Sequence, residues 1–266
     1  MPFLSRKYTA GENIDDAIAA ARGINLEGMK VIINKLGEAV KNKEQSQKIT
    51  EEYLQMIKVI NEKNILADVS IKPTNLGLLI DQNLFKKNLE KIVQEAERKD
   101  VFVWIDMEEP ELVHSTIRIF EEFHLKHKNI GICLQSYIQR TDEDIENLLS
   151  RNARIRIVKG VYLIPDEATI HNKNTVKERM FKFSVMLLKN KNNHAIATHD
   201  EEIIKFLKQI AKRYDIDKHS FEFQFLYGRK KKLQKKLAEE GYKVNIYLPY
   251  GGSWINYYLR RLEERF

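Results

Sequence analysis

Eight short runs of β-branched and aromatic residues alternate with longer charged segments, and this alternation constrains the fold more than any other feature of the chain. The runs cover 29–36, 67–73, 101–107, 130–137, 154–162, 194–200, 221–228 and 243–251. Between them, apolar residues recur at three- and four-residue spacing, the pattern of amphipathic helices. Parallel strands joined by crossover helices bury such runs economically, so the sequence predicts an α/β protein with a closed (β/α)8 barrel of the TIM type.

We expect the catalytic barrel to span 29–266. A short N-terminal segment, 1–28, precedes it and carries one helix near 15–25 that begins after Gly11 to Asn13. A doubly wound open sheet is the alternative fold. However, no strand is followed by a glycine-rich dinucleotide fingerprint or a phosphate loop, and the chain has only 11 glycines.

The length and the cysteine content bound the class of protein. A chain of 266 residues buries enough surface to fold without a disulfide or a metal. Its single cysteine, Cys133, lies in the apolar run IGICLQ, where we expect a buried structural thiol rather than a nucleophile. No stretch approaches the roughly 18 apolar residues of a spanning helix, so we expect a soluble protein in a reducing compartment.

The chain is basic, with 45 Lys and Arg against 38 Asp and Glu, a formal charge of +7. The densest run comprises Arg229, Lys230, Lys231, Lys232, Lys235 and Lys236. A solvated helix face explains this run best, with an anionic membrane surface as the alternative. No nucleic-acid-binding motif accompanies it, so we expect no nucleic-acid partner.

Barrel enzymes carry their chemistry at the carboxyl ends of the strands, and in this chain those ends are rich in cations. Lys72, Arg156 and Lys159 follow or end strands, and Arg260 and Arg261 lie on the final predicted helix. Guanidinium groups bind carboxylate and phosphate in bidentate fashion, so the cluster predicts an anionic substrate, an anionic cofactor, or both. A structural ion pair remains the alternative for Lys72.

Acidic and imidazole groups at the same ends admit more than one interpretation. Asp106, Glu108 and Glu109 could bind a metal, but the two glutamates could equally cap a helix that begins at Pro110. We therefore expect no metal. His199 could be a core histidine with satisfied hydrogen bonds.

Taken together, these blocks resemble the proline dehydrogenase family, flavin-dependent barrels that oxidise L-proline to 1-pyrroline-5-carboxylate. The matching blocks, in the order of the family, are LGE (36–38), VSIKPTNLG (69–77), IDMEE (105–109), GICLQSYIQRT (131–141), RIVKGVY (156–162), ATHD (197–200), FEFQFLYG (221–228) and YLPYGGSWINYYLRR (247–261). The resemblance is to the compact monofunctional bacterial type rather than to the long bifunctional one.

The resemblance implies a division of roles among site residues. The catalytic residues that it implies are Lys72, Asp106, Tyr247 and Arg260. Those implied to contact the substrate are Glu38, Tyr162, Leu226, Tyr257, Arg260 and Arg261. In this scheme Arg260 and Lys72 bind the proline carboxylate, Glu38 pairs with Arg260 to gate the pocket, and Arg261 also contacts the flavin.

The cofactor implied by the resemblance is FAD. Its implied contacts are Gln135, Arg156, Lys159, Gly160, Thr198, His199, Gln224, Arg261 and Glu264. A hydride would pass from proline C5 to flavin N5, and the electrons would continue to a quinone-type acceptor. Arg156 or Lys159 would stabilise the reduced flavin. We expect a cytoplasmic location, with peripheral contact to the inner face of the cytoplasmic membrane left open.

Two other functions remain open at the level of sequence. A barrel aldolase would use Lys72 or Lys159 as a Schiff-base nucleophile. A barrel that binds proline or flavin without turnover is the other alternative, since the chain has Asn34 where the family often has Asp, and Val161 where it usually has Ala.

Overall fold

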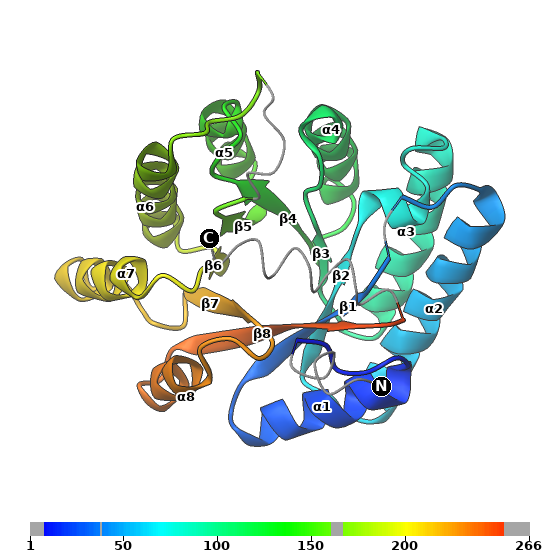
Figure 1. Ribbon diagram of the computed structural model, residues 1–266, viewed down its shortest axis with the longest axis horizontal. Coiled ribbons are helices and arrows are strands. Elements are labelled where there is room, and N and C mark those ends of the chain that lie inside the picture. Colours follow the sequence, from blue (N-terminus) through cyan, green and yellow to red (C-terminus); the bar gives the residue numbers. More distant parts are fainter. Residues whose placement is uncertain (1–7, 38, 161–166, 253–266) are drawn as a thin grey trace.

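Eight parallel strands close into a barrel in which each strand pairs with its neighbours in chain order (Figure 1). The computed structural model describes residues 8–37, 39–160 and 167–252. The strands are β1 (Lys30–Lys35), β2 (Ala67–Ile71), β3 (Val103–Ile105), β4 (Ile130–Gln135), β5 (Arg154–Val158), β6 (His194–Ala197), β7 (Phe221–Leu226) and β8 (Lys243–Tyr250). Every predicted run contains one strand, and the predicted (β/α)8 barrel is confirmed.

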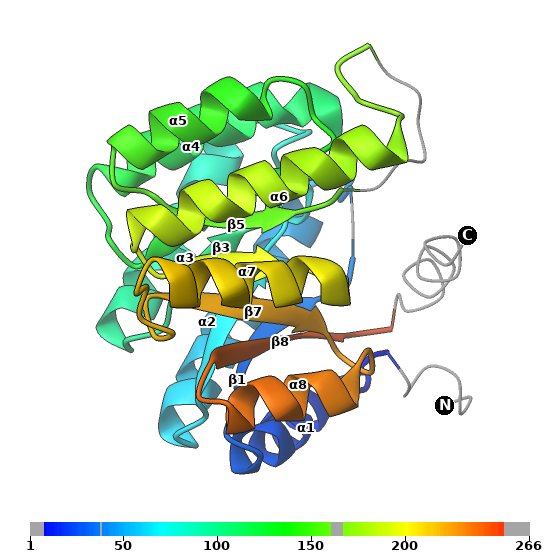
Figure 2. The same cartoon turned by 90° about the vertical axis from the view of Figure 1, so that its left-hand side faces the viewer.

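Eight α-helices of the described chain surround these strands (Figures 1 and 2). They are α1 (Ile14–Leu26), α2 (Lys43–Glu62), α3 (Gln82–Arg98), α4 (Val113–His124), α5 (Thr141–Ser150), α6 (Lys173–Asn190), α7 (Glu201–Arg213) and α8 (Lys231–Glu239). Several begin at a side-chain cap: Asn42, Asp81 and Asp200 each accept a hydrogen bond from a backbone N–H in the first turn.

Two short 3₁₀ helices follow the second and third strands at the carboxyl end of the barrel. They are η2 (Pro73–Leu76) and η3 (Pro110–Leu112), and each begins with proline, whose fixed φ suits the first helical position. Glu109 precedes η3 but makes no capping hydrogen bond through its side chain. Lys72 directly precedes η2, and η3 begins four residues after Asp106.

Helix α1 covers the seam between the last strand and the first. It contacts both β1 and β8, and Figure 1 places it between α8 and α2. Asn13 caps it by accepting a hydrogen bond from the Asp16 amide. Just before α1, the Ala10 amide donates to the Pro249 carbonyl at 2.8 Å, and the Gly11 carbonyl accepts from the Gly251 amide at 2.9 Å.

The apolar core lies mainly between the strands and the helices rather than inside the barrel. One large cluster joins the outer faces of the strands to the inner faces of the helices. A separate and much smaller cluster contains Ile32, Trp104 and Ala195, with Phe102 and Tyr247 beside it. Charged side chains share this part of the molecule: Arg154 and Arg156 lie over the Trp104 ring, Arg154 pairs with Glu222, and Asp68 pairs with Lys30. The lumen of the barrel is therefore largely polar.

Three further predictions can be compared with the structure. Cys133 is buried and burial raises its pKa to about 11, so the predicted structural thiol is confirmed. Four of the six residues of the basic run lie on α8, and all four, Lys231, Lys232, Lys235 and Lys236, are exposed, which confirms the predicted solvated face. No helix in the described part of the chain combines the length with the low charge that a membrane-spanning segment requires.

Candidate functional site

The Asp106 carboxylate is the centre of the polar cluster at the carboxyl end of the barrel. It directly follows β3 and is 9% exposed. Its Oδ1 accepts hydrogen bonds from Ser70 Oγ and Arg156 Nη1, each at 2.6 Å, and its Oδ2 accepts from the Tyr247 hydroxyl at 2.7 Å. One carboxylate thus joins side chains of β2, β5 and β8, which meet only across the lumen.

Arg156 of β5 forms the buried ion pair with Asp106. Its guanidinium is 3% exposed, lies 4.6 Å from the Trp104 ring centre, and donates from Nε to Gln224 Oε1 at 2.6 Å. Burial alone would lower the pKa of this guanidinium, but Asp106 and other neighbours raise it. Its Nη2 has no hydrogen-bond partner among the described residues, although it is buried. One charged donor is therefore available for a group bound at the end of the barrel.

Tyr247 of β8 presents a partly buried ring beside this ion pair. Its ring centre lies 5.6 Å from the Arg156 guanidinium carbon. Burial and the neighbouring Asp106 raise the pKa of the phenol well above its usual value. The hydroxyl therefore stays protonated at neutral pH and acts as a hydrogen-bond donor, while the ring forms an apolar wall.

Lys72 follows β2 and lies near a second carboxylate, that of Glu108. Glu108 accepts hydrogen bonds from the Thr74 amide at 2.8 Å and from the Thr74 hydroxyl at 2.7 Å. Burial raises the pKa of Glu108, and the positive charge of Lys72 acts in the opposite direction. The Thr74 hydroxyl also accepts from the Ala39 amide at 3.1 Å, so Glu108 braces both η2 and the chain that follows β1.

The ends of β4 and β5 are packed closely through a glycine. Gly160 has φ +100°, and a Cβ at this position would lie 2.0 Å from Cδ1 of Tyr137. The Tyr137 amide donates to the Lys159 carbonyl at 3.2 Å, and Lys159 itself is exposed. Gln135 is 7% exposed, and its Oε1 is buried without a hydrogen-bond partner in the described chain. This sector therefore offers an unused acceptor close to the strand ends.

The ends of β6 and β7 are joined by His199. Its Nε2 accepts a hydrogen bond from the Leu226 amide at 3.1 Å, so the ring carries its proton on Nδ1. The Thr198 hydroxyl accepts from the Asp200 amide at 3.1 Å and shapes the turn into α7. Both side chains are partly buried, as is Leu226.

Gln224 differs from the other residues that we assigned to the cofactor. It is 2% exposed, its Oε1 accepts from Arg156 Nε, and its Nε2 donates to Glu222 Oε1. Both ends of its amide are therefore engaged inside the lumen. Its described contacts hold Arg156, and its contact with a cofactor stays a prediction.

The predicted site residues within the described chain all lie at the carboxyl end of the barrel or just inside it. They are Lys72, Asp106, Gln135, Arg156, Lys159, Gly160, Thr198, His199, Gln224, Leu226 and Tyr247. The other predicted residues fall outside the described residues, namely Glu38, Tyr162, Tyr257, Arg260, Arg261 and Glu264; Val161 does so too.

Four residues in or beside the site were not assigned a role there from the sequence: Ser70, Thr74, Trp104 and Glu222. Ser70, Trp104 and Glu222 each lie on a strand. The residue two positions further along is in each case a predicted site residue: Lys72, Asp106 and Gln224, respectively. Since alternate residues of a strand share a face, this spacing could have identified them. No comparable signal marks Thr74, whose contact with Glu108 depends on the turn of η2.

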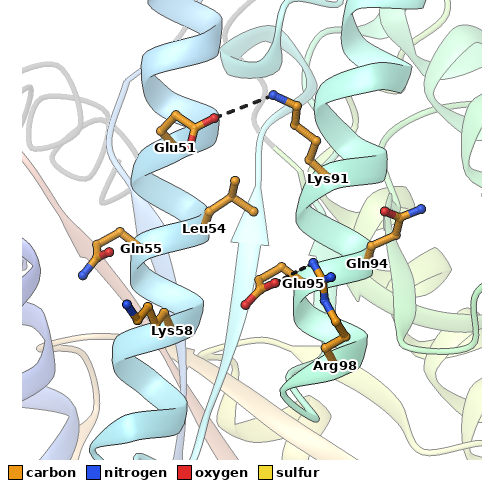
Figure 3. A pocket seen from close by; sticks show the side chains of 8 residues that line it. All are labelled: Glu51, Leu54, Gln55, Lys58, Lys91, Gln94, Glu95 and Arg98. Carbon is orange, nitrogen blue, oxygen red and sulfur yellow. Dashed lines mark hydrogen bonds and ion pairs between the residues drawn. The ribbon is translucent and has the colours of Figure 1, made fainter.

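A surface groove of about 320 Å³ lies apart from this site, between α2 and α3 (Figure 3). Four of its five charged groups pair with one another, Glu51 with Lys91 at 3.7 Å and Glu95 with Arg98 at 2.6 Å. The fifth, Lys58, pairs with Glu62 at 3.8 Å. The groove is on the outside of the barrel, so it does not contribute to the polar cluster at the strand ends.

Comparison with known proteins identifies relatives along nearly the whole chain. The family model described as proline dehydrogenase matches residues 17–265. Proline dehydrogenase 2 of Bacillus subtilis (strain 168) is 39% identical over 259 residues, which cover 97% of this chain and 86% of that protein. Proline dehydrogenase of Deinococcus radiodurans is 34% identical, with 98% and 86% covered.

A solved structure shares the fold. Proline utilization A from Bdellovibrio bacteriovorus, inactivated by N-propargylglycine, superposes with a TM-score of 0.92 at 23% identity. The match covers 98% of this chain but 32% of that one, so this chain spans about a third of the longer protein.

Proposed function

Because the chain belongs to the proline dehydrogenase family and is an oxidoreductase acting on proline, we propose that it oxidises L-proline to 1-pyrroline-5-carboxylate with FAD as its cofactor. The observation that carries this proposal is the cluster of Asp106, Arg156 and Tyr247, which joins three strands at the carboxyl end of the barrel. Lys72 lies at the same end and supplies the positive charge that a substrate carboxylate requires.

The chemistry of the described residues fits a flavin. A flavin presents both hydrogen-bond donors and acceptors on a planar ring, and the site has a buried donor in Arg156 Nη2 and a buried acceptor in Gln135 Oε1, each without a partner in the described chain. Gly160 leaves no side chain at a closely packed turn. When bound, FAD supplies a hydride acceptor at N5. We assign Gln135, Arg156, Lys159, Gly160, Thr198 and His199 to its binding.

The residues of this chain would bind and orient the proline. Lys72, together with Arg260 outside the described residues, would bind its carboxylate, and the ring of Tyr247 would form one wall for the pyrrolidine. Holding two reactants in register can contribute about 7–11 kcal/mol to lowering the barrier. Leu226 at the end of β7 would add apolar surface, together with Tyr162 and Tyr257.

The oxidation requires the neutral amine of proline, because an ammonium has no lone pair with which to form the C=N bond. The positive charge of Lys72 disfavours a second cation nearby and so favours loss of that proton. Two electrons leave C5 with the hydride, and the amine proton passes to solvent. Arg156 would stabilise negative charge on the reduced cofactor through its Nη2 donor.

The test is the visible spectrum of the purified protein, with and without L-proline under anaerobic conditions. A yellow protein that L-proline bleaches, with appearance of 1-pyrroline-5-carboxylate, is the expected result. A yellow protein that proline does not bleach would support a binding barrel without turnover. A colourless protein that borohydride crosslinks to a carbonyl substrate through Lys72 or Lys159 would support an aldolase.

We further propose that the electrons pass to a quinone-type acceptor and that the protein works in the cytoplasm. Peripheral contact with the cytoplasmic membrane is consistent with the exposed lysines of α8. Reoxidation of the bleached protein by a soluble quinone, faster than by oxygen, would support this acceptor class. Sedimentation with anionic vesicles would test the membrane contact.

A further inference from the structure

The polar side chains of the lumen form one continuous series of hydrogen bonds from its amino end to the candidate site. At the amino end, Arg154 Nη2 donates to Glu222 Oε2 at 2.8 Å. Glu222 Oε1 then accepts from Gln224 Nε2, and Gln224 Oε1 accepts from Arg156 Nε at 2.6 Å. Arg156 in turn binds Asp106. The series therefore runs without interruption to the cluster that we assign to cofactor and substrate.

This series has a defined direction of hydrogen bonding. A guanidinium can only donate, and the ionised carboxylate of Glu222 can only accept. Because Glu222 accepts at both oxygens, the Gln224 amide must direct its NH₂ group toward Glu222 and its oxygen toward Arg156. The Glu222 carboxylate thus determines that the oxygen of the Gln224 amide, and not its NH₂ group, is directed toward Arg156.

Because this series is buried, losing one of its hydrogen bonds costs more free energy than it would at the surface. Glu222 is 4% exposed and Gln224 is 2% exposed, so water cannot replace a lost partner. A buried donor that faces another donor costs the full desolvation free energy of the group. Arg156 would therefore move away from a reversed Gln224 amide, and its Nη2 would move with it.

From this arrangement we propose that Glu222 and Gln224 are positioning residues: Glu222 fixes the orientation of the Gln224 amide, which holds the Arg156 guanidinium in register with the cofactor. The inference rests on the proposed function, because Arg156 is there assigned to FAD. It assigns neither residue a contact with substrate or cofactor.

The test exchanges the amide and the acid. In Glu222→Gln alone, the introduced amide has one oxygen and can accept at that oxygen only, so a donor faces a donor somewhere in the series. In Gln224→Glu alone, two carboxylates face each other. In the double variant Glu222→Gln/Gln224→Glu, Arg154 donates to the new amide oxygen, that amide donates to the new carboxylate, and the carboxylate accepts from Arg156. The alternation of donors and acceptors is restored at the same net charge.

We expect each single variant to lower kcat/KM for proline by roughly 10- to 100-fold, because small displacements in a reacting site have effects of this order. The double variant should recover most of the loss. Asp68→Asn is the matched control: Asp68 is a buried carboxylate of the same lumen, but it pairs with Lys30 at 2.5 Å. It should lower the melting temperature and leave kcat/KM near that of the wild type.

A second readout needs neither cofactor nor turnover. The ¹⁵Nε–H resonance of Arg156 in flavin-free protein, assigned by its absence in Arg156→Lys, should shift and exchange faster in both single variants, and should return toward the wild-type position in the double variant. If a Glu222 variant fails to fold, Gln224→Met removes the acceptor of Arg156 together with the donor to Glu222, leaves the Arg154–Glu222 pair in place, and should give the same loss of kcat/KM and the same change in the resonance.

Two results would overturn the inference: single variants with wild-type kcat/KM and an unchanged Arg156 resonance, or a double variant as impaired as the singles in both. Failure of the proposed function looks different. In that case the wild-type protein itself does not oxidise proline, while the resonance of Arg156 still reports whether Glu222 and Gln224 hold it.

Discussion

Arg154 and Arg156 lie two residues apart on β5 and share the lumen, yet they serve different ends of the barrel. Arg154 pairs with Glu222, stacks 4.3 Å from the Phe102 ring centre and lines a cavity of about 370 Å³ at the amino end. Arg156 pairs with Asp106 and keeps an unpartnered Nη2 within the described chain. Side chains of one type on one strand thus divide into an arginine with a structural role and an arginine available for chemistry.

The difference lies in what each arginine has left to bind. Arg154 also donates from Nε to the Asn193 carbonyl at 2.6 Å, so its guanidinium joins β5 to β7 and to the chain before β6. Arg156 is more deeply buried, and its Nη2 is a buried donor without a hydrogen-bond partner among the described residues. A buried charged donor that is left without a partner is costly unless a ligand supplies one.

Arg156→Met removes the arginine at the carboxyl end of the barrel and should have the largest effect. It removes the charge opposite Asp106 and the donor assigned to the flavin. We expect kcat/KM for proline to fall by about 10²–10³-fold, the usual cost of losing a preorganised donor. Steady-state kinetics with a soluble acceptor, together with the dissociation constant for FAD, would measure it; wild-type values of both would refute the role of Arg156.

Arg154→Met removes the arginine at the amino end of the barrel and should chiefly affect the stability of the fold. It leaves Glu222 buried without its cation, so we expect the free energy of unfolding to fall by about 3 kcal/mol. Gln224 still donates to Glu222, so Arg156 keeps its position. Urea denaturation measures the first effect, and kcat/KM of the folded variant should stay within about threefold of the wild type, below 1 kcal/mol.

His194 provides a pH-dependent probe of the amino end. It is fully buried, its Nδ1 accepts from the Ile155 amide at 3.1 Å, and burial followed by the nearby Arg154 lowers its pKa from 6.5 to about 4. Between these pH values the unfolded chain binds the proton and the folded chain does not. Stability is therefore complete above pH 6.5, falls as the pH drops, and levels off below pH 4 after a loss of about 3 kcal/mol.

Denaturant titrations of the wild type and of His194→Gln between pH 4 and 7 would test this assignment. The Gln variant lacks the titrating group, so the difference in stability between the two proteins should shrink as the pH falls. A constant difference across this range would mean that the pKa of His194 is the same in the folded and unfolded chains, so that burial does not lower it.

Tyr247→Phe tests the hydrogen bond between Tyr247 and Asp106 at the carboxyl end of the barrel. It removes one hydrogen bond to Asp106 but keeps the ring. We expect a loss of about 1 kcal/mol in transition-state stabilisation, or roughly fivefold in kcat/KM. Because the pKa of the phenol is raised well above its usual value, the wild-type pH profile should show no tyrosine ionisation below pH 10. A limb near pH 9 that is absent from the Phe variant would contradict this.

Cys133 should give the smallest response. It is buried, and its raised pKa of about 11 keeps the thiol protonated at pH 8. We expect no alkylation by iodoacetamide in the native protein and full alkylation in guanidinium chloride, as mass spectrometry would show. Rapid labelling of the native protein would mean that the β4 region opens readily.

The fold could be predicted from sequence because the signals for it are local. Alternating apolar runs and amphipathic segments placed all eight strands, and the order of the strands follows from the right-handed crossover connections of parallel strands. The site could be predicted only in part. Tyr247 and Asp106 are 141 positions apart, and their hydrogen bond depends on how the barrel closes.

Gln224 shows why the rest could not be predicted. A block resemblance places a polar residue near a cofactor but does not show which polar neighbours it already satisfies. Its two partners, Arg156 and Glu222, come from β5 and β7, and only the closed lumen brings them together. The Thr74 to Glu108 contact likewise depends on a 3₁₀ turn that no helical spacing marks.

The position of α1 has a consequence for the order of folding during synthesis. This helix leaves the ribosome before any strand of the barrel, yet it packs on β8 as well as on β1, and β8 is made more than 200 residues later. At about 5–20 residues per second, α1 would wait on the order of ten seconds or more for that partner. We expect the barrel to close late, with the apolar side of α1 exposed to chaperones until then.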